Sequence, residues 1–257
     1  MDNKYTVVVT GSARRLGREI ALSLADAGYS IVLHSTARTT EAENTLAEIK
    51  AKGVNAIHIA ADLNHPEAAA EIFNRVFSED PSIFALIHNA AIFEGAGFRN
   101  SNLDEWQRNL NINLTAPYLL SLHFAEALKR RNGRIINMLD WRALRPGRDH
   151  FAYTISKAAL ASMTKAMALT LAPEITVNGL ALGAILPPAD GDSSITDPEK
   201  RNDFSSPITE TDPTIRPVPA GRWAEINEVT DTIKFLLSGP AYITGEIIHI
   251  DGGRHLV

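Results

Sequence analysis

The sequence has no cysteine among its 257 residues, which excludes disulfide bonds, thiolate metal sites and a cysteine nucleophile. It also lacks a basic surplus, because 25 Lys and Arg stand against 30 Asp and Glu, for a formal net charge of -5. We therefore do not expect nucleic acid or an anionic membrane as a partner. Residues 1–4 run directly into a strand-like segment without a signal-peptide pattern, so we expect a cytoplasmic protein.

In place of these features, short apolar β-rich runs alternate along the chain with longer helical patterns. The expected strands are 5–10, 30–34, 55–60, 84–88, 134–138, 176–180 and 246–250. The expected helices are 15–27, 40–50, 66–77, 103–130, 151–171 and 225–237. Runs such as Val7, Val8 and Val9 have no polar face, which is typical of a parallel sheet covered by helices on both sides. We predict a single α/β domain over residues 1–257, with a doubly wound, seven-stranded parallel sheet.

Residues 184–220 interrupt this alternation and hold seven of the 13 prolines. A long irregular segment in a compact domain is commonly a functional lid or a disordered insertion. This one follows the sixth expected strand, at the sheet edge where open α/β sheets bind ligands. We interpret it as a substrate lid, with an idle loop as the alternative.

The segment 10–17, which reads Thr-Gly-Ser-Ala-Arg-Arg-Leu-Gly, joins the first expected strand to the first expected helix. Backbone N–H groups and the positive end of the helix dipole meet there, which favours binding of a phosphate. The alternative is an ordinary strand–helix turn whose glycines relieve strain.

Tyr153 and Lys157 form a second pattern, because a spacing of four places them on one helix face. The lysine cation would lower the pKa of the phenol and make it a usable proton donor or acceptor. The same spacing also occurs on exposed helices that have no such role.

Several short motifs occur in a fixed order along the chain. They are Thr10-Gly11, Asn89-Ala90-Ala91, Asn113, Tyr153 with Lys157, and Asp251-Gly252-Gly253. With this order and spacing, the whole chain resembles the short-chain dehydrogenase/reductase family. The resemblance implies a Rossmann-type sheet, a nicotinamide cofactor and a homotetramer. It also implies that Tyr153 is the proton donor, that Lys157 binds the nicotinamide ribose and tunes Tyr153, and that Asn113 holds a proton-relay water.

Two positions depart from the usual pattern of that family. Arg15 stands where the Thr-Gly-x-x-x-Gly-x-Gly motif has its middle glycine. Asp140 stands thirteen residues before Tyr153, where most members have the catalytic serine. Together these changes resemble the pteridine reductases. The ending Asp251-Gly252-Gly253-Arg254-His255-Leu256, with His88-Asn89-Ala90, is similar to the bacterial dihydromonapterin reductases.

A pterin ring carries a 2-amino group and ring nitrogens, which a carboxylate such as Asp140 can recognise better than a hydroxyl. Phe93 is expected to stack on that ring opposite the nicotinamide, with a place in the core as the alternative. Arg15 is expected between the cofactor phosphates and the pterin; otherwise it is a surface arginine, which the helix dipole would disfavour. Trp141 either lines the same pocket or has only a structural role in packing. The expected substrate-binding residues are Arg15, Phe93, Asp140 and Tyr153, and the expected catalytic residues are Asn113, Asp140, Tyr153 and Lys157.

The second expected strand ends in His34-Ser35-Thr36-Ala37-Arg38, where an NAD-specific site would place a carboxylate. Arg38 and Arg14 instead offer positive charge for a 2′-phosphate, so we expect NADPH; the alternative is that Arg38 is a solvated loop charge. Asp62 resembles the family's adenine contact, or else it caps a helix. The expected cofactor-binding residues are Gly11, Arg14, Arg15, Leu16, Gly17, Ser35, Thr36, Arg38, Asp62, Leu63, Asn89, Ala90, Lys157 and Gly183.

The eight histidines show no metal-ligand pair at helical spacing, so no metal site is expected. Ser156 lacks the strand–turn context of a hydrolase nucleophile. Arg254 and His255 either reach the pocket of a neighbouring subunit or solvate the end of the chain.

These patterns predict NADPH-dependent reduction of a dihydropterin to the tetrahydro form, with dihydromonapterin, dihydrobiopterin or dihydrofolate as the small-molecule substrate. An ionised Asp140 would oppose Lys157 by keeping the Tyr153 phenol protonated. The alternative enzyme is a short-chain carbonyl reductase that acts on another small ketone. The alternative of a different class is a non-catalytic NADPH-binding regulator, and the site rather than the fold must decide among them.

Overall fold

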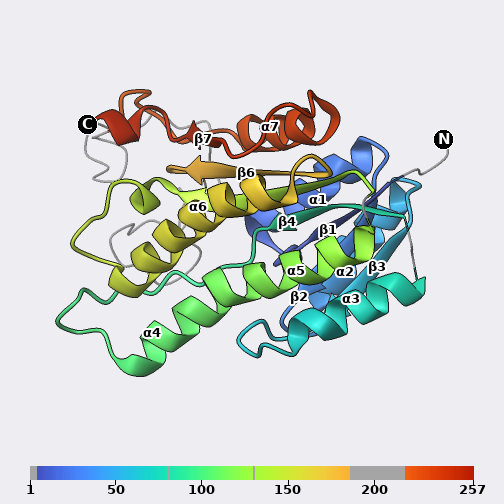
Figure 1. Ribbon diagram of the computed structural model, residues 1–257, viewed down its shortest axis with the longest axis horizontal. Coiled ribbons are helices and arrows are strands. Elements are labelled where there is room, and N and C mark those ends of the chain that lie inside the picture. Colours follow the sequence, from blue (N-terminus) through green and yellow to red (C-terminus); the bar gives the residue numbers. More distant parts are fainter. Residues whose placement is uncertain (1–4, 80–81, 130, 186–217) are drawn as a thin grey trace.

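The computed structural model describes residues 5–79, 82–129, 131–185 and 218–257 (Figure 1). Its strands are β1 (Thr6–Val9), β2 (Ser30–Ser35), β3 (Ala56–Ala60), β4 (Ile83–His88), β5 (Gly133–Asp140), β6 (Ile175–Leu182) and β7 (Ile247–Ile250). These described strands form one seven-stranded sheet in the order β3-β2-β1-β4-β5-β6-β7, and every neighbouring pair is parallel. The predicted fold class is therefore confirmed.

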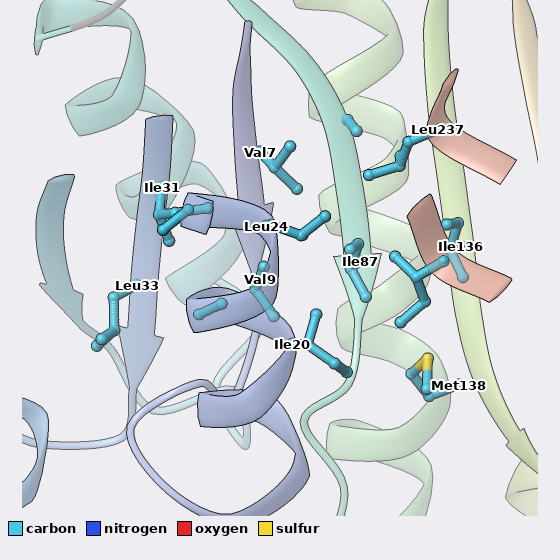
Figure 2. Close-up of a cluster of buried hydrophobic side chains, with 14 of the residues drawn as sticks. Val7, Val9, Ile20, Leu24, Ile31, Leu33, Ile87, Ile136, Met138 and Leu237 are labelled. Atoms are coloured by element: carbon cyan, nitrogen blue, oxygen red, sulfur yellow. The ribbon is translucent and has the colours of Figure 1, made fainter. Parts of the chain in front are cut away.

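Helices cover both faces of the sheet (Figure 1). One face packs against α1 (Arg15–Asp26), α2 (Thr40–Ala51) and α7 (Ile226–Ser238), and the other against α3 (Ala68–Glu79), α5 (Ala116–Leu128) and α6 (Phe151–Leu171). The two layers explain the uninterrupted valines of β1, because Val7 and Val9 belong to one apolar cluster and Val8 to the other. Figure 2 shows Val7 and Val9 next to Ile20 and Leu24 of α1. Each fully buried valine contributes about 1.5–3 kcal/mol of stability, so a polar residue at any of the three would be costly.

The prediction of one continuous helix over 103–130 is wrong for the middle of that segment. The segment consists of α4 (Leu103–Leu110), a π-helical turn η1 (Asn111–Thr115) and then α5. A π turn accommodates one extra residue and occurs frequently at functional sites. Here it contains Asn113, which is fully buried and whose side chain bonds both backbone groups of Ile92, at 2.9 Å to the N–H and 3.0 Å to the carbonyl. These two bonds hold the helix against the segment that follows β4.

The carboxyl ends of the strands define where a ligand can bind. The strand order reverses between β1 and β4, and open α/β sheets bind ligands in the crevice outside such a switch point. Two short turns complete this end of the sheet: η2 (Trp141–Ala143) follows β5, and η4 (Arg254–Leu256) follows β7. Of the expected substrate lid 184–220, residues 186–217 lie outside the described residues. Among the described helices, none combines the length and the apolar character needed to cross a membrane.

Candidate active site

The turn between β1 and α1 is built from close backbone contacts. Gly11 has a φ of +63°, and a Cβ there would lie 2.9 Å from the Cα of Ala90. A Cβ at Gly17 would collide with the carbonyl oxygen of Gly11 and with the Asn89 side chain. That side chain donates to the carbonyls of Thr10 and Gly11 at 2.9 and 3.0 Å. The predicted motifs after β1 and after β4 are thus joined directly at the switch point.

His34 supports the same turn, a role that the sequence did not indicate. The ring is buried at the end of β2; its Nδ1 accepts the N–H of Gly11 at 3.1 Å, and its Nε2 lies 3.0 Å from the Ala61 carbonyl. Because Nδ1 acts as an acceptor, the imidazole is neutral, with its proton on Nε2. Burial lowers the pKa of His34 to about 4, which keeps the ring neutral at physiological pH.

A cavity of about 530 Å³ opens beside this turn and gathers most of the predicted cofactor-binding residues. The predicted residues that line it are Gly11, Arg14, Arg15, Leu16, Gly17, Ser35, Thr36, Asp62, Leu63, Asn89 and Ala90. Glu41, in the first turn of α2, also lines it and was not predicted. The structure therefore brings the ends of β1, β2, β3 and β4 to one hollow at the sheet edge.

Three of the predicted cofactor-binding residues lie outside the lining of this cavity. Arg38 is exposed on the loop after β2, where its charge acts on His58 and helps to lower the pKa of that imidazole. This position fits the alternative of a loop charge. Gly183 packs against Asp251, whose Cα would be 2.6 Å from an added Cβ. Lys157 is buried further along the sheet edge.

Arg15 and Asp62 both line this cavity, and each has a notable local geometry. Arg15 is exposed and has a φ of +51°, a left-handed conformation that costs a non-glycine residue roughly 1–2 kcal/mol. The position thus keeps the backbone that suits the glycine usual in the family. The Asp62 carboxylate accepts the N–H of Asn64 at 3.0 Å, and α3 begins only at Ala68, so Asp62 does not cap that helix.

Acid is expected to destabilise the protein through two buried histidines. Burial lowers the pKa of His34 to about 4, and burial together with the Lys157 cation lowers the pKa of His88 to about 3. The folded state keeps both rings neutral while the unfolded chain binds protons below about pH 6.5. The free energy of unfolding should therefore decrease between pH 6.5 and 4, by about 1.4 kcal/mol per pH unit for each histidine. Urea denaturation at several pH values measures this slope.

The variant His88→Gln should lose one histidine's share of that slope, because the buried ring is gone. The matched control is His123→Gln on α5, a partly exposed histidine that lies 3.7 Å from Glu126. A slope in His88→Gln equal to that of the wild type would show that His88 does not resist protonation in the folded state.

A second group of residues surrounds the end of β5. The hydroxyl of Tyr153 donates to Asp140 Oδ2 at 3.0 Å, and Asp140 Oδ1 accepts the N–H of Arg142 at 2.8 Å. Lys157 donates to the carbonyl of Met138 at 2.7 Å, and its Nζ lies 5.9 Å from the centre of the Tyr153 ring. The phenol, the carboxylate and the ammonium thus meet at one end of the sheet, on side chains that β5 and α6 hold in place.

The expected effect of Lys157 on Tyr153 is corrected by this geometry. Burial, followed by the charge of Asp140 and its hydrogen bond, raises the pKa of Tyr153 well above its ordinary value of 10.0. The cation that lowers this pKa is Arg142 rather than Lys157. Burial lowers the pKa of Lys157 to about 8, although the Asp140 charge acts in the opposite direction. The carboxylate keeps the phenol protonated, as expected, and it does so with the help of burial.

Both the oxygen and the nitrogen of the Asn113 side-chain amide form hydrogen bonds. Besides the two bonds to Ile92, its Nδ2 lies 3.1 Å from the hydroxyl of Ser156, which in turn donates to the Tyr153 carbonyl at 2.7 Å. Asn113 therefore connects the segment after β4 with the helix that holds Tyr153. Ser156 is a buried part of this network, which agrees with its exclusion as a nucleophile.

Phe93 stands at the mouth of this second group with 54% of its surface exposed, so the alternative of a core aromatic is wrong. Its ring stacks on His150 with centroids 3.7 Å apart and meets the edge of Tyr153 at 4.6 Å. His150 has a φ of +52° at the start of α6, and its Nδ1 lies 2.9 Å from the Glu94 carbonyl. These contacts fix the Phe93 ring beside the phenol, and His150 is a site residue that the sequence did not indicate.

Comparisons with known proteins agree with this arrangement. A family model described as "Enoyl-(Acyl carrier protein) reductase" matches residues 11–255. The chain belongs to the short-chain dehydrogenase/reductase family. Members of this family are oxidoreductases, and the 3-oxoacyl-[acyl-carrier-protein] reductase FabG of Staphylococcus epidermidis is 30% identical over 98% of this chain and 99% of that protein.

Solved structures of the same family superpose on the chain from end to end. The FolM alternative dihydrofolate reductase 1 of Brucella canis, complexed with NADP, has a TM-score of 0.86 at 29% identity and covers 100% of this chain and 96% of its own. A blue fluorescent protein from a metagenomic library, in complex with NADPH, has a TM-score of 0.84 at 28% identity and covers 98% of each chain. This member of the short-chain dehydrogenase/reductase family therefore has solved relatives that hold a nicotinamide dinucleotide phosphate.

Proposed function

We propose that this short-chain dehydrogenase/reductase reduces a dihydropterin to the tetrahydro form with NADPH. The observation that carries the proposal is the pair formed by Asp140 and Tyr153, 3.0 Å apart, beside the exposed ring of Phe93. A flat heterocycle with amino and ring nitrogens needs an aromatic surface and a carboxylate acceptor, and both are present at one place. The FolM alternative dihydrofolate reductase from Brucella canis, with its high structural similarity, supports the same class of substrate.

The residues of the cavity at the switch point fit a dinucleotide phosphate. Gly11 and Gly17 leave space where a Cβ would collide, and the backbone N–H groups at the start of α1 can bind a pyrophosphate. Arg14, Ser35 and Thr36 line the same cavity, and the arginine and the Thr36 hydroxyl suit a 2′-phosphate. The Ser35 hydroxyl already donates to the Ala37 carbonyl at 2.7 Å and lies 2.7 Å from His58 Nε2. Glu41 is a carboxylate of the lining that would favour a ribose hydroxyl instead, but it lies on α2 rather than at the end of β2.

When bound, NADPH supplies the hydride. Tyr153 delivers the proton to a ring nitrogen of the pterin, and the raised pKa of its phenol ensures that the proton is present. Asp140 orients the hydroxyl, and its carboxylate would accept a hydrogen bond from the pterin edge. Arg142 favours the phenolate that forms as the proton leaves. Because the side-chain amide of Asn113 is already bonded to the backbone of Ile92, its part in this scheme is to hold that segment in place.

A homotetramer is part of the proposal, as the family resemblance implies. Large apolar side chains stand exposed on two neighbouring parts of the molecule, including Tyr118 and Leu122 on α5 and Leu169 on α6. Burial of such groups between subunits is favourable, so light scattering on the purified protein should give a mass near four chains.

The second candidate is a short-chain carbonyl reductase that acts on another small ketone. The observation in its favour is the 30% identity to a 3-oxoacyl-[acyl-carrier-protein] reductase over nearly the whole chain. One experiment separates the candidates: NADPH oxidation with dihydromonapterin, dihydrobiopterin and dihydrofolate, and with a panel that includes a 3-oxoacyl thioester and simple ketones. We expect turnover with the pterins. Activity confined to the ketones would overturn the proposal, and tight NADPH binding without any turnover would instead favour the non-catalytic regulator.

A further inference from the structure

Two arginines from distant parts of the chain meet over one tryptophan next to the proposed substrate pocket. The guanidinium carbon of Arg142 lies 4.9 Å from the centre of the Trp141 ring, and that of Arg254 lies 4.5 Å from it. Arg142 is also 5.7 Å from the centre of the Phe93 ring, the surface on which the pterin is proposed to stack. Both cations therefore stand within reach of a substituent that extends from a ring held by Phe93.

The chain fixes Arg254 in this position. The preceding Asp251 is buried, and its carboxylate binds the imidazole of His255 at 2.8 Å and the N–H groups of Gly253 and His255 at 3.0 Å each. Arg145 donates to the Arg254 carbonyl at 3.4 Å. Arg254 and His255 are thus partly buried and lie against η2.

The placement of two cations on one indole is unfavourable without a compensating negative charge. Burial, followed by the charge of Arg142, lowers the pKa of Arg254, and the charges of Asp140, Asp149 and Asp251 oppose this shift only in part, so the two guanidinium groups repel each other. Asp149 supplies part of the compensating charge, because its carboxylate lies 3.5 Å from Arg142 and from His150. Among the described residues, Asp140 also binds Tyr153 and Asp251 also binds His255. The Nε of Arg142 is buried and makes no hydrogen bond within the described residues. An anionic ligand would relieve this repulsion and satisfy such donors.

We propose that Arg142 and Arg254, both placed over Trp141, form a subsite for a carboxylate or phosphate group that the substrate carries beyond its reducible ring. This inference rests on the proposed function, because Asp140 and Phe93 are taken to hold the ring itself. It adds a substrate preference: among dihydropterins, those with an anionic side chain are better substrates than neutral ones. Guanidinium groups suit this task because they bind carboxylates and phosphates through two parallel hydrogen bonds.

The test compares substrates that share the pterin ring and differ in charge. Dihydrofolate carries carboxylates, dihydroneopterin monophosphate carries a phosphate, and dihydrobiopterin is neutral. In Arg254→Gln, the ratio of kcat/KM for dihydrofolate to that for dihydrobiopterin should fall about ten-fold or more, mainly through KM, because a charge-assisted bond is lost. Arg254→Lys should recover part of the ratio. Lys234→Gln on α7, which removes a positive charge paired with Asp231, is the control and should keep the ratio of the wild type.

The comparison with dihydroneopterin monophosphate identifies which anion the subsite binds. If the kcat/KM ratio falls in Arg254→Gln for dihydrofolate alone, the subsite binds carboxylates. If it falls for dihydroneopterin monophosphate alone, the subsite binds phosphates. An unchanged ratio for both in Arg254→Gln would overturn the subsite. Calorimetric binding of p-aminobenzoylglutamate and of inorganic phosphate to the NADP-loaded enzyme needs no turnover. If no pterin is reduced but one of these anions binds at least about ten-fold more weakly to Arg254→Gln, the proposed function fails and the subsite stands. Equal binding to both proteins refutes the subsite.

Discussion

Replacement of Tyr153 by phenylalanine is expected to lower kcat for dihydropterin reduction by about 10²- to 10⁴-fold, the usual contribution of a positioned proton donor. The hydroxyl is the group removed, and it donates to Asp140 at 3.0 Å in the wild type. The phenyl ring that remains keeps its edge contact with Phe93, so the fold and the pocket shape should persist. Steady-state and single-turnover rates of NADPH oxidation measure the loss at the chemical step.

NADPH binding should be nearly unaffected in Tyr153→Phe, because the cavity for the dinucleotide is built from the ends of β1 to β4. Quenching of protein fluorescence by NADPH measures that affinity. Tyr242→Phe is the matched control, since this tyrosine is 99% exposed and should retain full activity. A kcat for Tyr153→Phe within about two-fold of the wild type would remove Tyr153 as the proton donor.

The fold could be predicted from the sequence because its information is local and repeated. The valines of β1 have no polar face, and the structure explains this by two apolar layers that take Val7 and Val9 on one side and Val8 on the other. The break of the helix at 111–115 could not be predicted in this way. The π-helical turn holds Asn113, whose two hydrogen bonds to Ile92 join segments that hydrophobic periodicity treats separately.

The site was predicted in its residue types better than in its electrostatics. The spacing of Tyr153 and Lys157 indicated a lysine that acts on the phenol, but burial and Asp140 decide the pKa of Tyr153. Burial is a property of the packed molecule, so a spacing rule cannot supply it. His34 was missed for a similar reason, because its two partners, Gly11 and Ala61, lie just beyond the ends of β1 and β3.

Arg38 shows a further limit of residue types. Its charge at the end of β2 indicated a phosphate ligand, and the structure leaves it exposed and outside the lining of the cavity that Ser35 and Thr36 line. The direction of a single loop side chain depends on the backbone around it, which the residue type does not specify. Arg142 and Arg254 show how much lies beyond local patterns, since their meeting over Trp141 requires the whole sheet to be assembled.

Asp140→Ser should convert the pocket toward the form usual in the family and lower kcat/KM for dihydropterins by about 10²-fold, because a charged acceptor for the pterin edge is lost. The pH profile should change as well. In the wild type, turnover should decline above pH 8, because the pKa of Lys157 is about 8 and the cation that the family resemblance assigns to the nicotinamide ribose is lost there. Asp140 raises that pKa, so its removal should move the decline to lower pH. Rates of NADPH oxidation between pH 6 and 9 give both quantities.

The control for Asp140→Ser is Asp149→Asn, which removes a half-exposed carboxylate 3.5 Å from Arg142 on the same loop. In Asp149→Asn, the decline in turnover on the alkaline side of the pH profile, the alkaline limb, should stay near pH 8, because Asp149 does not contribute to the pKa of Lys157. Asp140→Asn keeps the shape of the side chain and removes its charge. If the carboxylate acts through its charge, this variant must shift the alkaline limb to lower pH as far as Asp140→Ser does. Retention of dihydropterin turnover and of the alkaline limb in both Asp140 variants would contradict the assigned role. The pterin specificity would then have to come from Phe93 and the arginines over Trp141, and Asp140 would serve only to keep the Tyr153 proton in place.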